Sequence, residues 1–164
     1  MTLVRDFRPA DWPVVEAIYM EGIRTGFATF ETSPKSEDAW TNTSVKNSQL
    51  VAEASDGTVC GWALLWPVSD RCAYRGVAEV SVYVAASARG KGVGKLLLNA
   101  LATRSETLGV WTMQAGIFEE NKASIALHEA CGFRTVGVRE RLGNLNGVWK
   151  NVMLMEKRSN TVGL

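Results

Sequence analysis

Apolar residues in the first part of the chain follow the spacing of a strand and then that of a helix. Leu3–Arg8 alternates apolar and polar side chains, which predicts a short strand. Apolar positions in Val14–Ile23 recur every three or four residues, and we expect a helix here with Asp11 as its N-cap. After a loop over residues 26–35, Ser36 is expected to cap a second helix.

The middle of the chain has the pattern of three strands. Gln49–Ala54 and Val59–Trp66 are apolar runs separated by Asp56-Gly57, a dipeptide typical of hairpin turns. Val77–Val84 is rich in valine, which favours a further strand.

The second half of the chain alternates between helical and strand patterns. The predicted elements are a helix from Val93 to Gly109, a strand Trp111–Phe118, a helix from Asn121 to Gly132, and two strands, Phe133–Val138 and Val148–Met155. Ala123, Ala126, Leu127 and Ala130 carry the helical spacing of the second of these helices. The order β-α-α-β-β-β-α-β-α-β-β predicts a mixed α/β sheet with helices packed on it. No linker or repeat interrupts it, so we expect residues 1–164 to form one domain.

The composition excludes several classes of function. The chain has 18 Lys and Arg residues and 17 Asp and Glu residues, which gives a net charge of +1. Nucleic-acid binding through bulk positive charge is therefore not expected. No apolar run approaches the roughly 18 residues of a membrane span, and the N-terminal residues lack the apolar core of a signal peptide. Three cysteines without metal or disulfide spacing predict reduced thiols in a cytoplasmic protein. A single histidine excludes a multi-histidine metal site.

The segment most informative about chemistry is Val82–Lys95, which runs from a strand through a glycine-rich loop into a helix. Glycines let the backbone approach a ligand closely, and the free N–H groups at a helix start suit a phosphate or pyrophosphate. A tight structural turn into the helix is the alternative interpretation. The glycines and basic residues concerned are Gly90, Gly92, Gly94, Arg89, Lys91 and Lys95.

Two common phosphate-binding patterns do not fit this loop. A P-loop needs Gly-Lys-Ser/Thr, whereas Lys95 is followed by Leu96 and its first glycine position is Arg89. The dinucleotide pattern GxGxxG fails because its last glycine position is Lys95, and the loop lies in the middle of the chain. The spacing that does fit is Arg-x-x-Gly-x-Gly, from Arg89 to Gly94.

This loop resembles the acetyl-CoA site of the GNAT superfamily of N-acetyltransferases, and a second motif of that family is present as Asn121–Phe133. The resemblance covers the whole chain. It implies a GNAT-like mixed, mostly antiparallel sheet with helices packed on both faces, and acetyl-CoA as the acetyl donor. From the histidine and cysteine content, no metal is expected. Asn121 is expected both to cap its helix and to contact the donor. The donor-binding residues implied are Val82, Tyr83, Val84, Arg89, Gly90, Lys91, Gly92, Val93, Gly94, Lys95, Asn121 and Ser124.

Within the superfamily, the chain resembles the branch that acetylates phosphinothricin and methionine sulfoximine. The chain departs from that branch at Asn151, where Asp is usual, and at Asn146 or Lys150, where some members carry His. If that His assists catalysis in those members, the assistance is absent here. The matching segments are Thr29-Phe30-Glu31, Ala73-Tyr74-Arg75, Glu79–Val84, Leu127-His128-Glu129 and Gly147–Val152.

Acetyl transfer needs a base, because an α-amino group has a pKa near ~8 and must lose a proton to attack. Glu79 interrupts an apolar strand and matches the catalytic glutamate of the branch, so we expect it to be the base. A solvent-facing charge at a strand end is the alternative. The resemblance implies a backbone N–H near Val84 as the donor to the oxyanion. His128 stands where many family members have Tyr, and it either protonates the departing thiolate or packs at the donor site.

The acceptor site is expected around the start of the catalytic strand. Arg71 and Arg75 precede that strand, where a guanidinium can hold a carboxylate through two hydrogen bonds. A solvated loop arginine is the alternative for each. The expected acceptor residues are Phe30, Arg71, Tyr74, Arg75, Glu79, Val80 and Ser81, with Tyr83 as a further wall of the pocket.

The sequence therefore predicts an acetyl-CoA-dependent N-acetyltransferase that acts on a small amino acid or analogue, such as methionine sulfoximine, methionine sulfone or phosphinothricin. The cysteines lie in no motif with a histidine, so direct transfer is expected rather than an acyl-enzyme. The alternatives are a GNAT enzyme for another amine, such as a protein N-terminus, and a non-catalytic acyl-CoA-binding module. We expect no nucleic-acid or membrane partner, and a homodimer, because dimers through the C-terminal strands are frequent in similar proteins.

Overall fold

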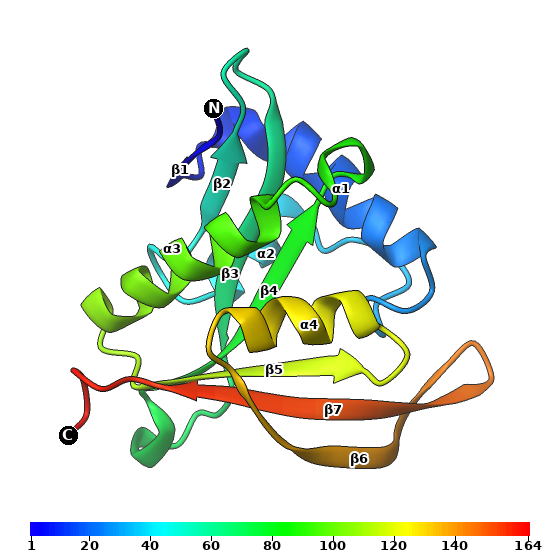
Figure 1. Cartoon of the computed structure of the whole chain (residues 1–164), viewed down its shortest axis with the longest axis vertical. Coiled ribbons are helices and arrows are strands. Elements are labelled where there is room, and N and C mark those ends of the chain that lie inside the picture. The colour runs from blue at the N-terminus through cyan, green and yellow to red at the C-terminus, as the bar shows by residue number, and fades with distance from the viewer.

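A computed structural model of the chain, which describes all 164 residues, is built on one seven-stranded sheet with the strand order β1-β2-β3-β4-β5-β7-β6 (Figure 1). Every neighbouring pair is antiparallel except β4 and β5, which are parallel. The predicted mixed, mostly antiparallel sheet is therefore confirmed. The strands are β1 (Leu3–Asp6), β2 (Leu50–Glu53), β3 (Val59–Pro67), β4 (Val77–Val84), β5 (Thr112–Phe118), β6 (Arg134–Leu145) and β7 (Val148–Arg158).

Helices cover both faces of the sheet, as the resemblance implied. Helix α1 packs Val15, Ile18 and Tyr19 against one face, and helix α3 packs Leu97, Leu98 and Leu101 against the other. The strand β3 between them is apolar at successive positions because both of its faces are buried. None of the helices combines the length and the apolar character that a membrane span requires. The helices are α1 (Trp12–Arg24), α2 (Glu37–Thr43), α3 (Val93–Thr107) and α4 (Lys122–Ala130).

The three residues predicted as N-caps stand at the N-cap positions of their helices, and two of them cap through their side chains. The Ser36 hydroxyl accepts a hydrogen bond from the Ala39 backbone N–H at 3.2 Å, and the Asn121 side chain accepts one from the Ser124 N–H at 3.2 Å. Asp11 stands at the N-cap position of α1, as predicted, but its side chain makes no capping hydrogen bond there, and Pro9–Asp11 forms a short 3₁₀ turn before the helix. The Asp11 carboxylate instead accepts from the Arg8 backbone N–H at 2.8 Å and forms an ion pair with Arg5.

The sequence pattern misplaces the buried face of α4 and the ends of the last two strands. Ile125 and His128 are the buried residues of α4, whereas the alanines at 123, 126 and 130 are exposed, because alanine fits either face of a helix. Strand β6 continues from Arg134 to Leu145, beyond the predicted end at Val138. Its pairing with β7 shifts register twice, and such irregularities interrupt the alternation that marks a strand in the sequence.

Candidate active site

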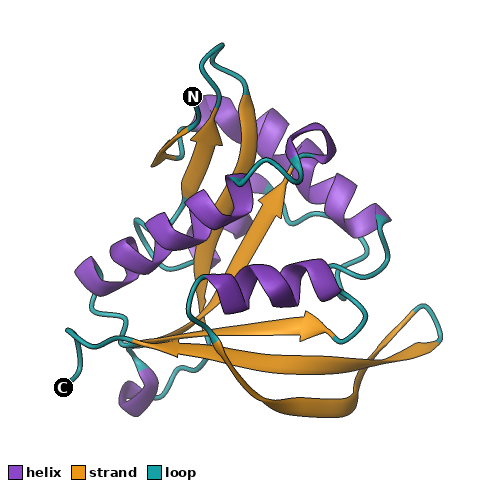
Figure 2. Ribbon diagram, viewed as in Figure 1, coloured by secondary structure: helices purple, strands orange, loops and turns teal.

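A cleft of about 880 Å³ opens where the sheet splits between β4 and β5. The two strands pair only over Val77–Glu79 and Thr112–Gln114, and beyond this point they diverge (Figure 2). From Val80 onward the edge of β4 that faces β5 therefore has no strand partner, and its backbone groups are open to the cleft.

The cleft passes through the sheet. It is lined by residues from both faces of β4, with Val82 and Val84 on the side of α3 and Glu79, Ser81 and Tyr83 on the side of α1. Two ligands can therefore meet at the opening from opposite faces of the sheet. We call the part on the α3 and α4 side the donor half and the part on the α1 side the acceptor half.

The donor half is built around the glycine-rich turn (Arg89–Lys95) that leads into α3. Gly90 and Gly92 have φ values of 73° and 82°, a left-handed conformation that favours glycine. Gly92 is the N-cap of α3, and the free backbone N–H groups of the first helical turn follow it. This geometry suits a diphosphate group, because the N–H groups and the helix dipole both favour negative charge.

Two basic side chains of the glycine-rich turn donate hydrogen bonds to nearby backbone carbonyls and so stabilise the turn. Arg89 Nε donates a hydrogen bond to the Val84 carbonyl at 3.2 Å, and Lys91 Nζ donates to the Ser87 carbonyl at 2.8 Å. Of the residues expected to bind the donor, all line the cleft except Lys91. The structure thus brings together residues of two distant motifs, the turn before α3 and the start of α4.

Glu79 lies at the opening, with its carboxylate above β5. A Cβ atom at Gly116 would lie 3.2 Å from Glu79 Oε1, so the glycine leaves the space that the carboxylate occupies. Burial raises the pKa of Glu79 above its usual range, and the positive charge of Arg139 partly opposes the rise. A carboxylate that holds a proton at higher pH than usual is better matched to an amine as a base.

His128 is buried in α4 and lines the cleft, with 2% of its surface exposed. Its Nδ1 lies 2.7 Å from the Ser124 carbonyl oxygen. Because a carbonyl oxygen only accepts, Nδ1 carries the proton and Nε2 presents a lone pair that has no partner in the chain. Burial lowers the pKa of His128, against the effect of the Ser124 hydrogen bond, so the ring is neutral at pH 7. The ring edge packs on Phe133, with the centroids 5.0 Å apart.

The loop between α1 and α2 closes the acceptor half. The Phe30 ring packs on Phe118 with a centroid distance of 4.6 Å, and it lies over Gly143 of β6, where a Cβ atom would clash with it. Asn121 Nδ2 donates to the Phe27 carbonyl at 3.3 Å. Asn121 therefore caps α4 and also connects the loop between α1 and α2 to the donor half through a hydrogen bond.

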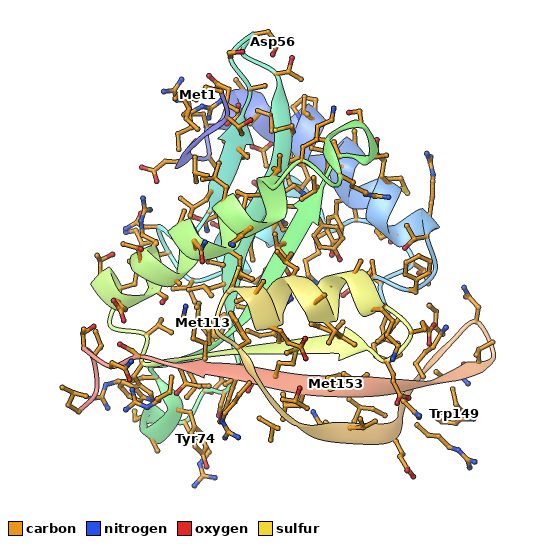
Figure 3. The ribbon with its side chains drawn as sticks, in the orientation of Figure 1. Met1, Asp56, Tyr74, Met113, Trp149 and Met153 are labelled. Atoms are coloured by element: carbon orange, nitrogen blue, oxygen red, sulfur yellow. The ribbon has the colours of Figure 1, made fainter.

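Arg71, Tyr74 and Arg75 are not brought into the cleft. They lie around a 3₁₀ turn, Cys72–Tyr74, before β4, at the end of the sheet where β4 and β5 are still paired. Arg71 stacks over Tyr74 and Arg75 over the Trp111 ring, at 5.6 and 5.4 Å from the ring centroids. Figure 3 shows Tyr74 at the outer edge of the molecule. Within one chain, none of these three residues lines the acceptor half.

Sequence reasoning missed Arg139, a cation that lines the acceptor half together with Leu142, Val152 and Leu154. The only sequence signal was a basic residue one position beyond the predicted end of the strand Phe133–Val138. Its proximity to Glu79 depends on the pairing of β6 with β7 and of β7 with β5, and no local pattern encodes that pairing.

Asn151, which replaces the usual Asp of the branch, lies outside the cleft and joins three segments. Its side-chain oxygen accepts from the Arg141 backbone N–H at 2.9 Å, and its amide nitrogen donates to Glu119 at 3.0 Å. An aspartate has no N–H to donate, so the contact with Glu119 uses the asparagine specifically.

A sheet split between two parallel strands, with a half-buried carboxylate at the split and a glycine-rich helix start lining the same cleft, fits the class of enzymes that bring a phosphorylated donor and a nucleophile together from opposite faces of a sheet. Residues 12–133 match the Acetyltransferase (GNAT) family, and the chain belongs to this family of acetyl-CoA-dependent acetyltransferases.

Comparison with individual proteins confirms the narrower resemblance. The chain is 38% identical to phosphinothricin N-acetyltransferase of Alcaligenes faecalis, over 96% of this chain and 82% of that protein. It is 34% identical to the L-methionine sulfoximine/L-methionine sulfone acetyltransferase of Pseudomonas aeruginosa, over 93% and 92%. A phosphinothricin acetyltransferase from Sinorhizobium meliloti, solved in complex with acetyl-CoA, superposes with a TM-score of 0.87 at 33% identity, covering 99% of this chain and 90% of that one.

Proposed function

We propose that the protein transfers the acetyl group of acetyl-CoA to the α-amine of a small amino acid or analogue of the methionine sulfone, methionine sulfoximine or phosphinothricin type. The observation that carries this proposal is the position of Glu79, which lies at the opening of the sheet between the two halves of the cleft. The named relatives act on acceptors of this type, and they cover nearly the whole chain.

The residues of the donor half fit the chemistry of acetyl-CoA. The N–H groups at the start of α3 bind its diphosphate, and the open edge of β4 binds the extended arm that leads to the thioester. When bound, acetyl-CoA supplies an activated acetyl group whose carbonyl carbon accepts a nucleophile. A backbone N–H of β4 near Val84 donates to the carbonyl oxygen as charge develops on it.

Glu79 takes the proton that the amine must lose. The acceptor arrives as an ammonium, and one proton passes to the Glu79 carboxylate, directly or through a water molecule. The amine lone pair then forms the new N–C bond, the C–S bond breaks, and the sulfur leaves with its electron pair. The second proton of the nitrogen is released to solvent, which also protonates the thiolate.

We assign His128 a packing role rather than that of the acid. The only N–H of the neutral ring is on Nδ1 and is donated to Ser124, so no proton is available at Nε2 for a thiolate. The Nε2 lone pair, which has no partner in the chain, would accept a hydrogen bond from an N–H group of the donor.

An acceptor panel tests the function. Purified protein with acetyl-CoA is assayed for CoA release with L-methionine sulfone, L-methionine sulfoximine, phosphinothricin and a short peptide with a free N-terminus. We expect turnover with the amino acids and little with the peptide. Preference for the peptide would establish the alternative of a protein N-terminus, and tight acetyl-CoA binding without turnover on any amine would establish a binding module.

We further propose that the chain acts as one catalytic domain in a cytoplasmic homodimer. Its three cysteines are free thiols, consistent with a reducing compartment. Large apolar side chains are exposed along β6 and β7, and Figure 3 shows Trp149 at the outer end of this part of the sheet. Exposed apolar side chains favour a protein contact. The residues concerned are Val136, Val138, Leu142, Val148 and Trp149.

A further inference from the structure

Arg139 and Glu79 project from the same face of the sheet. Arg139 pairs with Val152 of β7, and Val152 pairs with Phe118 of β5, so these three side chains form a row on one face. Gly116 lies two residues before Phe118 on that same face, beneath the Glu79 carboxylate. The two charged side chains therefore approach each other across the floor of the acceptor half.

The spacing of the strands leaves room for a small molecule between these two charges. β4 and β6 are separated by β5 and β7, which corresponds to roughly 14 Å between their backbones at about 4.8 Å per strand. Glu79 extends toward β5 from one side, and Arg139 extends from the other. Gly116 and the apolar Leu154 lie on the floor between them.

The Arg139 guanidinium is free to bind a ligand. It takes part in none of the six ion pairs of the chain, although its positive charge lowers the pKa of Glu79. The other cations that line the cleft, Arg89 and Lys95, belong to the glycine-rich turn of the donor half. Arg139 is thus the one cation of the acceptor half.

We propose that Arg139 binds the α-carboxylate of the acceptor and thereby selects free amino acids over amides and peptides. The proposal rests on the proposed function and specifies how its acceptor is recognised. A free amino acid carries an ammonium and a carboxylate on one carbon, which matches Glu79 on one side and Arg139 on the other. A guanidinium holds a carboxylate through two parallel hydrogen bonds, and an amide or a peptide bond cannot reproduce that pairing.

The test compares L-methionine sulfone with its carboxamide, which differs only in the group that faces Arg139. For the wild-type protein we expect kcat/KM to favour the acid by about 10- to 150-fold, the usual loss when a charge-assisted hydrogen bond is removed. In Arg139→Gln the acid should fall to the level of the carboxamide, and the carboxamide rate and the KM for acetyl-CoA should stay near wild type. Arg139→Lys should restore part of the preference, since it keeps the charge but not the two-point geometry.

Arg141→Gln is the matched control, because it removes the same charge from the same strand at a position that does not line the cleft. It should keep the wild-type ratio of acid to carboxamide. An unchanged ratio in Arg139→Gln, with normal turnover of the acid, overturns the assignment of Arg139 and leaves the proposed function standing. Wild-type protein that acetylates neither compound overturns the proposed function, and the assignment of Arg139 with it.

Discussion

At the scale of single residues, Glu79 is the group on which the proposed chemistry depends, because its carboxylate lies at the opening of the sheet. Burial holds its pKa above the usual range while Arg139 limits the rise. The base form is therefore lost at a higher pH than for an exposed glutamate.

We expect Glu79→Gln to lower kcat by about 10²- to 10⁴-fold, the usual contribution of a general base, because glutamine has nearly the same shape but cannot accept the proton. In the wild type, kcat/KM should rise with pH through the raised pKa of Glu79. In the variant this acidic limb should disappear. Steady-state CoA release between pH 5 and 9 measures both effects. Glu140→Gln, an exposed position on β6, should leave rate and profile unchanged. A normal kcat in Glu79→Gln would place the base elsewhere.

The same substitution should stabilise the fold at neutral pH. A carboxyl whose pKa is raised by folding binds more protons in the native state than in the unfolded state, so stability falls as pH rises through that window. Glutamine does not ionise, so the variant does not lose this stability as the pH rises. Thermal unfolding should therefore give Glu79→Gln a higher Tm than the wild type at pH 7, with the difference shrinking as the pH falls. A lower Tm at pH 7 would contradict the view that burial dominates the environment of Glu79.

At the scale of elements, the start of α3 creates the donor half through its backbone conformation. Gly92 has φ = 82°, and no atom lies within 4 Å of a Cβ built on it, so alanine there is strained without being crowded. We expect Gly92→Ala to weaken acetyl-CoA binding by about 10-fold, because relief of a strain of roughly 1–2 kcal/mol moves the N–H groups of the turn. Calorimetric titration with acetyl-CoA measures the affinity.

Gly109→Ala provides the matched control for the glycine-rich turn. Gly109 follows the other end of α3, has φ = 76° and is equally uncrowded, so both variants carry the same kind of backbone strain. Both should lose similar stability, and only Gly92→Ala should lose affinity for acetyl-CoA. Equal affinities in the two variants would remove the glycine-rich turn from the donor site.

Strand β5 positions the base through the absence of a side chain at Gly116. A methyl group there would lie 3.2 Å from Glu79 Oε1, so Gly116→Ala should displace the carboxylate by a few tenths of an ångström. We expect kcat to fall about 10-fold, since small misplacements of catalytic groups cost rate, while the KM for acetyl-CoA stays constant. Gly137→Ala on β6, where a Cβ atom meets nothing within 4 Å, should leave kcat unchanged. If both variants keep the wild-type kcat, Gly116 has no positioning role.

At the scale of the whole molecule, the split in the sheet opens the donor half and the acceptor half of the cleft on opposite faces, while the far edge of the sheet exposes apolar side chains. Val148 on β7 is 56% exposed and Val14 on α1 is 40% exposed. If β6 and β7 form the dimer contact, Val148→Glu should yield monomers, because a charge in an apolar contact must be desolvated. Val14→Glu should leave the dimer intact. Sedimentation velocity distinguishes these results, and a wild-type monomer would contradict the dimer.

The order of the elements and most of the donor half could be predicted from the sequence, because the forces that determine them act over short distances along the chain. The glycine-rich turn forms from neighbouring residues, because a strand, the glycines and a helix start follow one another in the sequence. Asn121 caps α4 through a hydrogen bond with Ser124, which is only three residues further along the chain. Asp11 shows the limit of such reasoning, since it stands at the N-cap position of α1 but its carboxylate binds Arg5 and the Arg8 backbone N–H instead of capping the helix.

The acceptor half was decided only by the tertiary structure. Strand pairing brings Glu79, Gly116 and Arg139 together from three strands. It leaves Arg71 and Arg75 outside the cleft, at the paired end of β4, although both are closer to Glu79 along the chain than Arg139 is. The register of β5, β7 and β6 depends on packing and on two irregularities in the last pair, which a sequence pattern does not record. Short-range patterns therefore determined the residues of the donor half, and long-range pairing determined the residues of the acceptor half.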